Sequence, residues 1–145
     1  MPYEYISEVG IRLEEDMIFK CDLGQINMNN LFIDEQHKKT KDKIGPNPSK
    51  LLALSVLACM GASFAYCLQK YNISLSDFEG KAYITSTRNE KGFWRIKKIS
   101  IDLRPKIDNP KIRKKADECK KFFEQFCIIS ESLKEGIEIN TDLFY

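Results

Sequence analysis

The sequence has no CxxC pair and a single histidine, His37. A zinc site built from cysteine and histidine therefore has little support, and we expect neither a metal nor a cofactor. Cysteine occurs five times, and an odd number argues against a disulfide scaffold. We predict that the thiols are free, either reactive or buried. The five positions are Cys21, Cys59, Cys67, Cys119 and Cys127.

A strong excess of either charge is also missing. The formal net charge of the 145 residues is +2, which does not indicate a nucleic-acid partner. Hydrophobic residues make up 43% and charged residues 30%, values typical of a soluble globular protein. The opening residues, MPYEYISEVGIRLEED, are polar and acidic rather than basic and then apolar, so we expect no secretory signal and a cytoplasmic protein.

One long uncharged run is present, from Leu51 to Leu68. At 18 residues it reaches the lower limit for a membrane span. It is rich in alanine, serine and glycine, however, and the strands expected around it would otherwise lack a core. We therefore predict no membrane contact and a fully buried central helix from Pro48 to about Tyr71, with Asn47 as its N-cap. A helix that is apolar all round must be covered on all sides, which favours a second subunit.

Before and after this helix, apolar and polar residues alternate as they do in strands. Apolar runs around Glu14–Asp16 predict a hairpin, and a third strand is expected near residues 28–36. A second hairpin, with its turn at Asn89–Gly92, is predicted across residues 80–103.

Helical spacing returns from Lys111 to about Phe126, and a short helix follows with Ser130 as a candidate cap and Gly136 as its end. Residues 137–145 are expected to form a final strand. Strands and helices are segregated, so the prediction is one α+β domain over residues 1–145.

Two cysteines occupy positions where a thiol could be reactive. Cys59 lies in the middle of the long helix, and Cys127 lies where one helix ends and the next begins. A helix N-terminus can lower the pKa of a thiol. The alternative for each is a small buried hydrophobic residue, and it is favoured for the other three cysteines. Cys67 is about 80° around the helix and roughly 12 Å along it from Cys59, too far for a disulfide within the helix.

The residues around both thiols resemble the OsmC/Ohr family, the osmotically inducible and organic hydroperoxide resistance proteins. The segment GPNPSKLL, followed by Cys59, is similar to the family stretch that leads to its peroxidatic cysteine. The segment FCIISESLKEGIEI is similar to the second family motif, with Cys127, Ser130 and Leu133 at its matching positions. The resemblance covers most of the chain, from about Met28 to the end.

This resemblance implies a fold and a chemistry. The fold would be an antiparallel sheet wrapped on a long buried central helix, in an intertwined homodimer. Cys59 would attack a small organic hydroperoxide, Cys127 would form a disulfide with the resulting sulfenic acid, and a dithiol such as dihydrolipoamide would reduce it. An arginine from the N-terminal region would favour the thiolate, and Arg12 is the candidate.

The chain departs from the family at one position. Good peroxidases of the family carry a glutamate that orients the arginine, and here Ser49 stands in its place, followed by Lys50 as an alternative cation. Two other functions therefore stay open. One is a dimer that binds a small apolar ligand with inert cysteines, and the other is a redox sensor.

Overall fold

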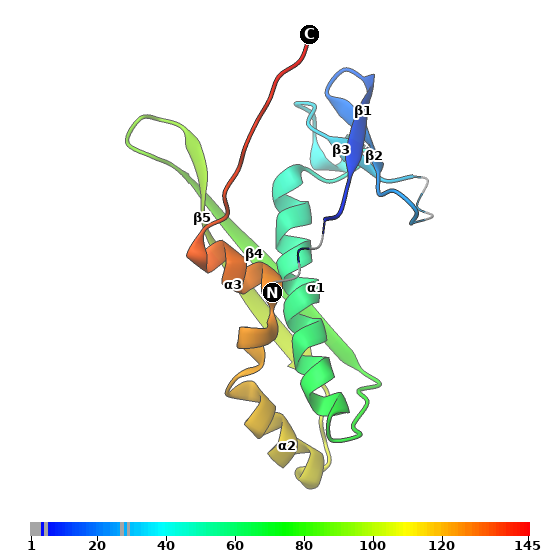
Figure 1. Cartoon of the computed structure of the whole chain (residues 1–145), viewed down its shortest axis with the longest axis vertical. Coiled ribbons are helices and arrows are strands. Elements are labelled where there is room, and N and C mark those ends of the chain that lie inside the picture. Colours follow the sequence, from blue (N-terminus) through cyan, green and yellow to red (C-terminus); the bar gives the residue numbers. More distant parts are fainter. Residues whose placement is uncertain (1–3, 5, 27, 29) are drawn as a thin grey trace. The chain divides into compact units, whose positions relative to one another are not determined.

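The computed structural model describes residues 4, 6–26, 28 and 30–145. Antiparallel strands and a long helix make the chain an α+β protein, which confirms the predicted fold class. The chain falls into two compact units, residues 1–51 and 52–145, and the long helix α1 (Pro48–Gln69) begins at the end of the first (Figure 1).

The N-terminal unit contains a three-stranded antiparallel sheet. Its strands are β1 (Gly10–Glu15), β2 (Ile18–Asp22) and β3 (Phe32–Asp34), paired in that order. The turn between β1 and β2 contains Met17, whose φ of 55° closes the hairpin. The predicted hairpin is confirmed, and the third strand is confirmed over residues 32–34 of the predicted 28–36, of which residue 29 lies outside the described residues.

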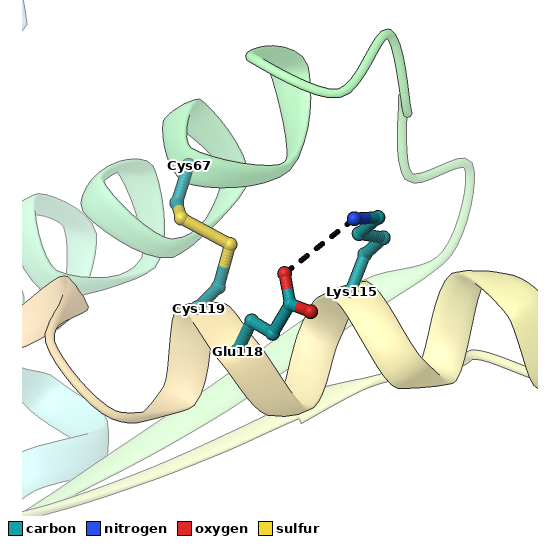
Figure 2. Close-up of a disulfide and its surroundings, with 4 residues drawn as sticks. All are labelled: Cys67, Lys115, Glu118 and Cys119. Carbon is teal, nitrogen blue, oxygen red and sulfur yellow. Dashed lines mark ion pairs between the residues drawn. A yellow bond between two sulfur atoms is a disulfide. The ribbon is translucent and has the colours of Figure 1, made fainter.

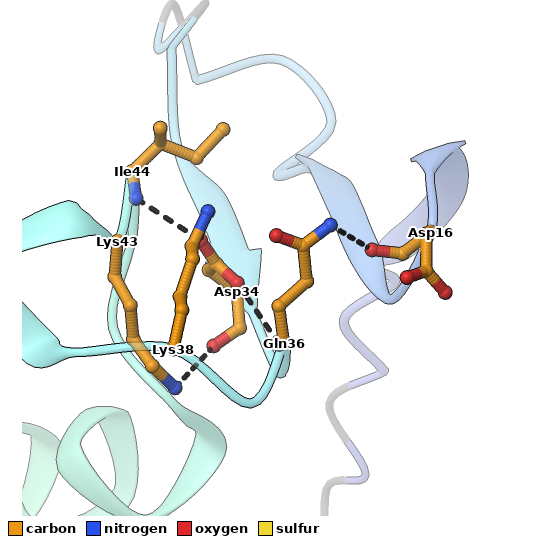
Figure 3. Close-up of polar contacts among 6 residues, drawn as sticks. All are labelled: Asp16, Asp34, Gln36, Lys38, Lys43 and Ile44. Carbon is orange, nitrogen blue, oxygen red and sulfur yellow. Dashed lines mark hydrogen bonds and ion pairs between the residues drawn. The ribbon is translucent and has the colours of Figure 1, made fainter.

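A buried carboxylate organises the loop that follows this sheet (Figure 3). The side chain of Asp34 is fully buried and accepts hydrogen bonds from the backbone N–H groups of Gln36 (3.0 Å) and Ile44 (3.1 Å). The ammonium group of Lys38 lies 3.0 Å from it. Burial alone raises the pKa of Asp34, but these three donors together lower it below its ordinary value. The carboxylate therefore stays ionised at neutral pH and fixes the loop before α1.

Helix α1 begins and ends where the sequence indicates. The side chain of Asn47 accepts a hydrogen bond from the N–H of Lys50 at 2.9 Å, so Asn47 is the predicted N-cap. Pro48 occupies the first turn, where its missing N–H costs nothing. At the other end, Asn72 adopts a φ of 60°, which turns the chain away from the helix.

The C-terminal unit is built on the long hairpin of β4 (Phe78–Arg88) and β5 (Trp94–Pro105), which α1 accompanies (Figure 1). The turn falls at the predicted Asn89–Gly92, where Gly92 has a φ of 85°. Gly80 lets β4 approach the helix closely. A Cβ at this position would lie 2.9 Å from Leu57, so only glycine fits without a shift.

The segment after the hairpin differs from the prediction. Helix α2 (Pro110–Lys120) is capped by Asn109 and ends before the helical spacing does, and the chain continues through the 3₁₀ turn η2 (Phe123–Phe126). The expected helix to Phe126 is therefore wrong. Phe122 leaves the helical region with a φ of −145°, and this break turns the next aromatic side chain onto α1.

The last helix, α3 (Ile128–Glu135), was predicted, and Gly136 ends it with a φ of 90°. Its N-cap, however, is Cys127 and not Ser130, which lies within the first turn. The predicted final strand is wrong as well, because residues 137–145 form no strand. In the described part of the chain no strand pairs with them, and their apolar side chains, such as Ile139 and Phe144, are exposed.

A core cluster joins α1, α2 and the neighbouring loops, and a disulfide runs through it. Cys67 on α1 and Cys119 on α2 are 5% and 0% exposed, and they are bonded to each other, with their Cα atoms 5.9 Å apart (Figure 2). Phe64, Leu68 and Ala116 complete the buried cluster. Both cysteines pack in the core as expected, but the expectation that they are free thiols is wrong. An odd cysteine count says nothing about which of them lie within bonding distance.

The single chain covers only one side of α1. Val56, Met60 and Phe64 are buried, whereas Leu54 and Tyr66 are each 58% exposed. The exposed side chains follow one stripe of the helix at spacings of three and four: Leu54, Ser55, Ala58, Ala62, Tyr66 and Gln69. Full burial of α1 was expected with a second subunit covering this side, and that part of the expectation stays a prediction. By length and composition α1 would also reach across a membrane, a property that it shares with core helices of soluble proteins.

Candidate active site

Cys59 lies in the fourth turn of α1 and is partly exposed. One turn further on, the hydroxyl of Ser63 donates a hydrogen bond to the carbonyl oxygen of Cys59 at 2.8 Å. This bond satisfies a buried polar group within the helix without using the thiol. The sulfur of Cys59 is thus left to interact with the segment that faces α1.

That segment is the N-terminus of α3, where Cys127 is the capping residue. Its Sγ accepts a hydrogen bond from the N–H of Ser130 at 3.4 Å, as the oxygen of a serine or aspartate cap would. Cys127 is fully buried. The backbone N–H groups of Ile128 and Ile129 in the same first turn interact with the sulfur of Cys59. The free donors of one helix end therefore surround both sulfur atoms.

The two thiols lie close enough for each to shift the pKa of the other by hydrogen bonding. Burial raises the pKa of Cys59, and the neighbouring Cys127 raises it further, more than the N–H groups of α3 lower it. Burial also raises the pKa of Cys127, but hydrogen bonds from Ser130, Cys59 and Ile129 outweigh it, so the net shift is downward. The donors at the N-terminus of α3 therefore favour the thiolate form of Cys127.

The predicted cations do not lie in the unit that holds these thiols. Arg12 is on β1 and belongs to the N-terminal unit, so its role stays a prediction. Ser49 and Lys50 lie in the first turn of α1. Nine helical steps from Lys50 to Cys59 amount to about two and a half turns, which puts their Cα atoms on opposite sides of the helix axis.

A cation that the sequence analysis missed lies on α3. The pKa of Lys134 is raised, first by its hydrogen bond to Glu131 and also by the charges of Glu131, Glu124 and the thiolate of Cys127. Its ammonium group lies 3.0 Å from Glu131 and 3.9 Å from Glu124. Lys134 follows Cys127 by seven residues, or two helical turns, so the spacing alone could have placed both on one face.

An open cavity of about 450 Å³ lies between α1, β5 and α3. Ser130, whose N–H donates to the sulfur of Cys127, and Lys134 both line it. Most of the remaining lining is apolar, from Leu52, Val56, Met60, Ile96, Ile99, Ile101 and Leu133. A small apolar molecule would fit in this cavity, whose wall includes the capping partner of Cys127, Ser130. Among the described residues, no three His, Cys, Asp or Glu side chains gather as metal ligands would.

The chain belongs to the OsmC-like protein family, because the model of that family matches residues 39–142. The match includes both cysteines of the site and spans parts of both units. Among curated proteins the chain has no significant match.

Solved structures of this family have the same fold. The organic hydroperoxide resistance protein OhrB of Bacillus subtilis is 21% identical, with a TM-score of 0.64 over 90% of this chain and 91% of that one. An OsmC-like protein from Mycoplasma pneumoniae is 16% identical, with a TM-score of 0.65 and coverages of 91% and 89%. An organic hydroperoxide resistance protein OsmC from Legionella pneumophila is 12% identical, with a TM-score of 0.64 and 92% coverage of both chains. At these identities the likeness concerns the fold.

Proposed function

We propose that this protein is a cytoplasmic, homodimeric thiol peroxidase that reduces organic hydroperoxides through a disulfide between Cys59 and Cys127. A dithiol of the dihydrolipoamide type restores the two thiols. The observation that carries this proposal is the meeting of both sulfur atoms at the N-terminus of α3, where backbone N–H groups face them.

The reaction has three steps. The Cys59 thiolate attacks the distal oxygen of the hydroperoxide, the O–O bond breaks, and an alcohol leaves while Cys59 becomes a sulfenic acid. Cys127 then attacks the sulfur of Cys59, so that an S–S bond forms, the S–O bond breaks and water leaves. The dithiol finally reduces this disulfide and becomes a disulfide itself.

The electrostatics assign a task to each group. The lowered pKa of Cys127 suits the second step, in which a thiolate attacks. Because burial raises the pKa of Cys59, the first step requires a cation that stabilises the thiolate of this residue, and the guanidinium of Arg12 is the proposed group.

The surroundings support the organic substrate and the dimer. The apolar lining of the cavity beside Ser130 suits an alkyl or aryl hydroperoxide. The exposed stripe of α1 and the exposed apolar residues of 137–145 are surfaces that a second copy would cover. The hydroperoxide resistance proteins among the similar structures support the same substrate class.

The test is turnover of an organic hydroperoxide with a dithiol, followed by trapping of the sulfenic acid with dimedone. We expect Cys59→Ser to abolish turnover and Cys127→Ser to accumulate the trapped acid on Cys59. Cys21→Ser is the matched control, because Cys21 lies in the other unit. Undiminished turnover of Cys59→Ser would refute the mechanism, and trapping on Cys127 in that variant would reverse the two roles.

The raised pKa of Cys59 favours a second candidate, a dimer that binds a small apolar ligand in the same cavity while the thiols stay inert. Slow alkylation of Cys59 at neutral pH, together with tight binding of an apolar ligand and no turnover, would support it. A redox sensor would instead form the Cys59–Cys127 disulfide once and pass it to a partner protein.

A further inference from the structure

Two pairs of cysteines connect α1 to residues 119–127. The two cysteines on α1 are as far apart in sequence as the two in the later segment. Cys67 follows Cys59 by eight residues, and Cys119 precedes Cys127 by eight. Cys59 meets Cys127, and Cys67 is bonded to Cys119. The pairs therefore form two rungs between α1 and a segment that runs antiparallel to it.

An aromatic contact lies between the rungs. Phe64 on α1 packs edge-to-face against Phe123 of η2, with ring centroids 5.3 Å apart and an interplanar angle of 81°. Phe64 stands between Cys59 and Cys67 in the helix, and Phe123 stands between Cys119 and Cys127. Three contacts in order thus hold the two segments in one register.

The chain between Cys119 and Cys127 is a continuous series of hydrogen-bonded turns. The N–H of Phe122 donates to the carbonyl of Cys119 at 3.2 Å, and the N–H of Gln125 donates to that of Phe122 at 3.2 Å. The N–H of Cys127 then donates to the carbonyl of Glu124 at 3.0 Å. A constraint placed on Cys119 is therefore transmitted to Cys127 through a stiff linker.

We propose that the Cys67–Cys119 disulfide is a positioning clamp that holds Cys127 at Cys59 and so raises the effective concentration of one thiol at the other. This inference rests on the proposed function for its biological meaning but not for its test. When the clamp is closed, the sulfenic acid of Cys59 meets Cys127 before a second hydroperoxide molecule does. When it is absent, the second hydroperoxide oxidises the sulfenic acid to a sulfinic acid and leaves as an alcohol.

The experiment measures the dithiol–disulfide equilibrium of Cys59 and Cys127 against glutathione buffers, by differential alkylation and peptide mass spectrometry. All proteins carry Cys21→Ser, which removes the remaining thiol. We expect the clamp-free variant, Cys67→Ala/Cys119→Ala, to lower the equilibrium constant for disulfide formation by about tenfold, which raises the reduction potential by about 30 mV.

Leu68→Ala is the structural control, because Leu68 is fully buried in the same cluster and the variant keeps the disulfide. It should leave the equilibrium constant unchanged. An unchanged constant in the clamp-free variant would overturn the proposal, as would an equal loss in Leu68→Ala or a failure of Cys59 and Cys127 to pair in the parent protein.

A second measurement separates this inference from the proposed function. With tert-butyl hydroperoxide, the clamp-free variant should lose its first thiol at the parent rate but accumulate more sulfinic acid on Cys59. A parent protein that does not react with the hydroperoxide would refute the peroxidase while the glutathione result stands. Equal sulfinic acid in a reacting parent and variant would overturn the clamp.

Discussion

The two sulfur pairs of this protein join the same two segments, yet they have opposite characters. Cys67 and Cys119 lie among Phe64, Leu68 and Ala116, and they are closed in a disulfide. Cys59 and Cys127 are free thiols at the N-terminus of α3, where N–H groups interact with both sulfur atoms.

The difference teaches that the surroundings of a cysteine, and not its place in a pattern, decide its chemistry. An apolar cluster has no donor or cation that would stabilise a thiolate, so the pair inside it contributes packing and a cross-link. A helix N-terminus stabilises a negative sulfur and lowers the pKa of Cys127, so we expect the reactive thiols in that pair.

The largest difference between the pairs should appear in alkylation. In the native protein, iodoacetamide should label the pair of Cys59 and Cys127 faster than Cys67 and Cys119 by roughly two orders of magnitude or more, because only free thiolates react. Peptide mass spectrometry after a timed quench measures this ratio. As a control, iodoacetamide should label all four cysteines alike after denaturation and reduction. Labelling of Cys67 in the native protein would contradict the expected difference between the two pairs.

The two pairs should also differ in how much each contributes to the free energy of unfolding. The disulfide of Cys67 and Cys119 spans 52 residues of sequence, and loss of such a loop closure lowers the free energy of unfolding by about 4 kcal/mol. Cys59→Ala/Cys127→Ala deletes two sulfur atoms without opening a cross-link and should cost about 1–2 kcal/mol. Denaturant titration of both double variants gives the comparison, and equal losses would contradict it.

The aromatic contact between the pairs should have a smaller effect. Phe123→Leu removes the edge-to-face interaction with Phe64 but keeps an apolar side chain, so it should lower the free energy of unfolding by about 1 kcal/mol. Phe93→Leu, at an exposed position in the β4–β5 hairpin, is the control and should have little effect. If Phe123→Leu lowered the free energy of unfolding as much as loss of the disulfide does, the aromatic contact and the disulfide would not contribute independently.

The smallest expected change concerns acidity. The pKa of Cys127 is lowered because hydrogen bonds from Ser130, Cys59 and Ile129 together overcome the effect of burial, so Ser130→Ala, which removes the side-chain contribution of Ser130, should raise it. The thiolate absorbance at 240 nm should then appear at higher pH than in the parent. Ser55→Ala, whose hydroxyl bonds to the carbonyl of Leu52, should leave the titration unchanged. A midpoint that Ser130→Ala does not move would show that backbone donors alone set this pKa.

Much of the fold could be predicted because the determining signals are local. The cap at Asn47, the turn at Asn89–Gly92 and the end of α3 at Gly136 each depend on a few neighbouring residues. The short α2 could not be predicted, since its end depends on Phe123 packing against a helix more than fifty residues away in sequence. Residues 137–145 show the same limit, because a strand needs a neighbour that their own sequence cannot supply.

For the candidate site, motif resemblance predicted that Cys59 and Cys127 act as a pair, and the structure places the two thiols within hydrogen-bonding reach, but the resemblance gave no information on their relative acidity. That depends on which thiol caps α3 and on burial, neither of which is visible in spacing. The bond between Cys67 and Cys119 was missed for a related reason. Each was judged alone as a core residue, although the equal intervals from Cys59 and Cys127 were already present in the sequence.

The matched intervals also bear on how the chain acquires its bonds during oxidative folding. Four cysteines have three connectivities, but crossed partners would have to slide past each other by eight helical residues, roughly 12 Å, before bonding. Closure of the Cys67–Cys119 bond therefore sets Cys59 opposite Cys127 rather than opposite Cys119.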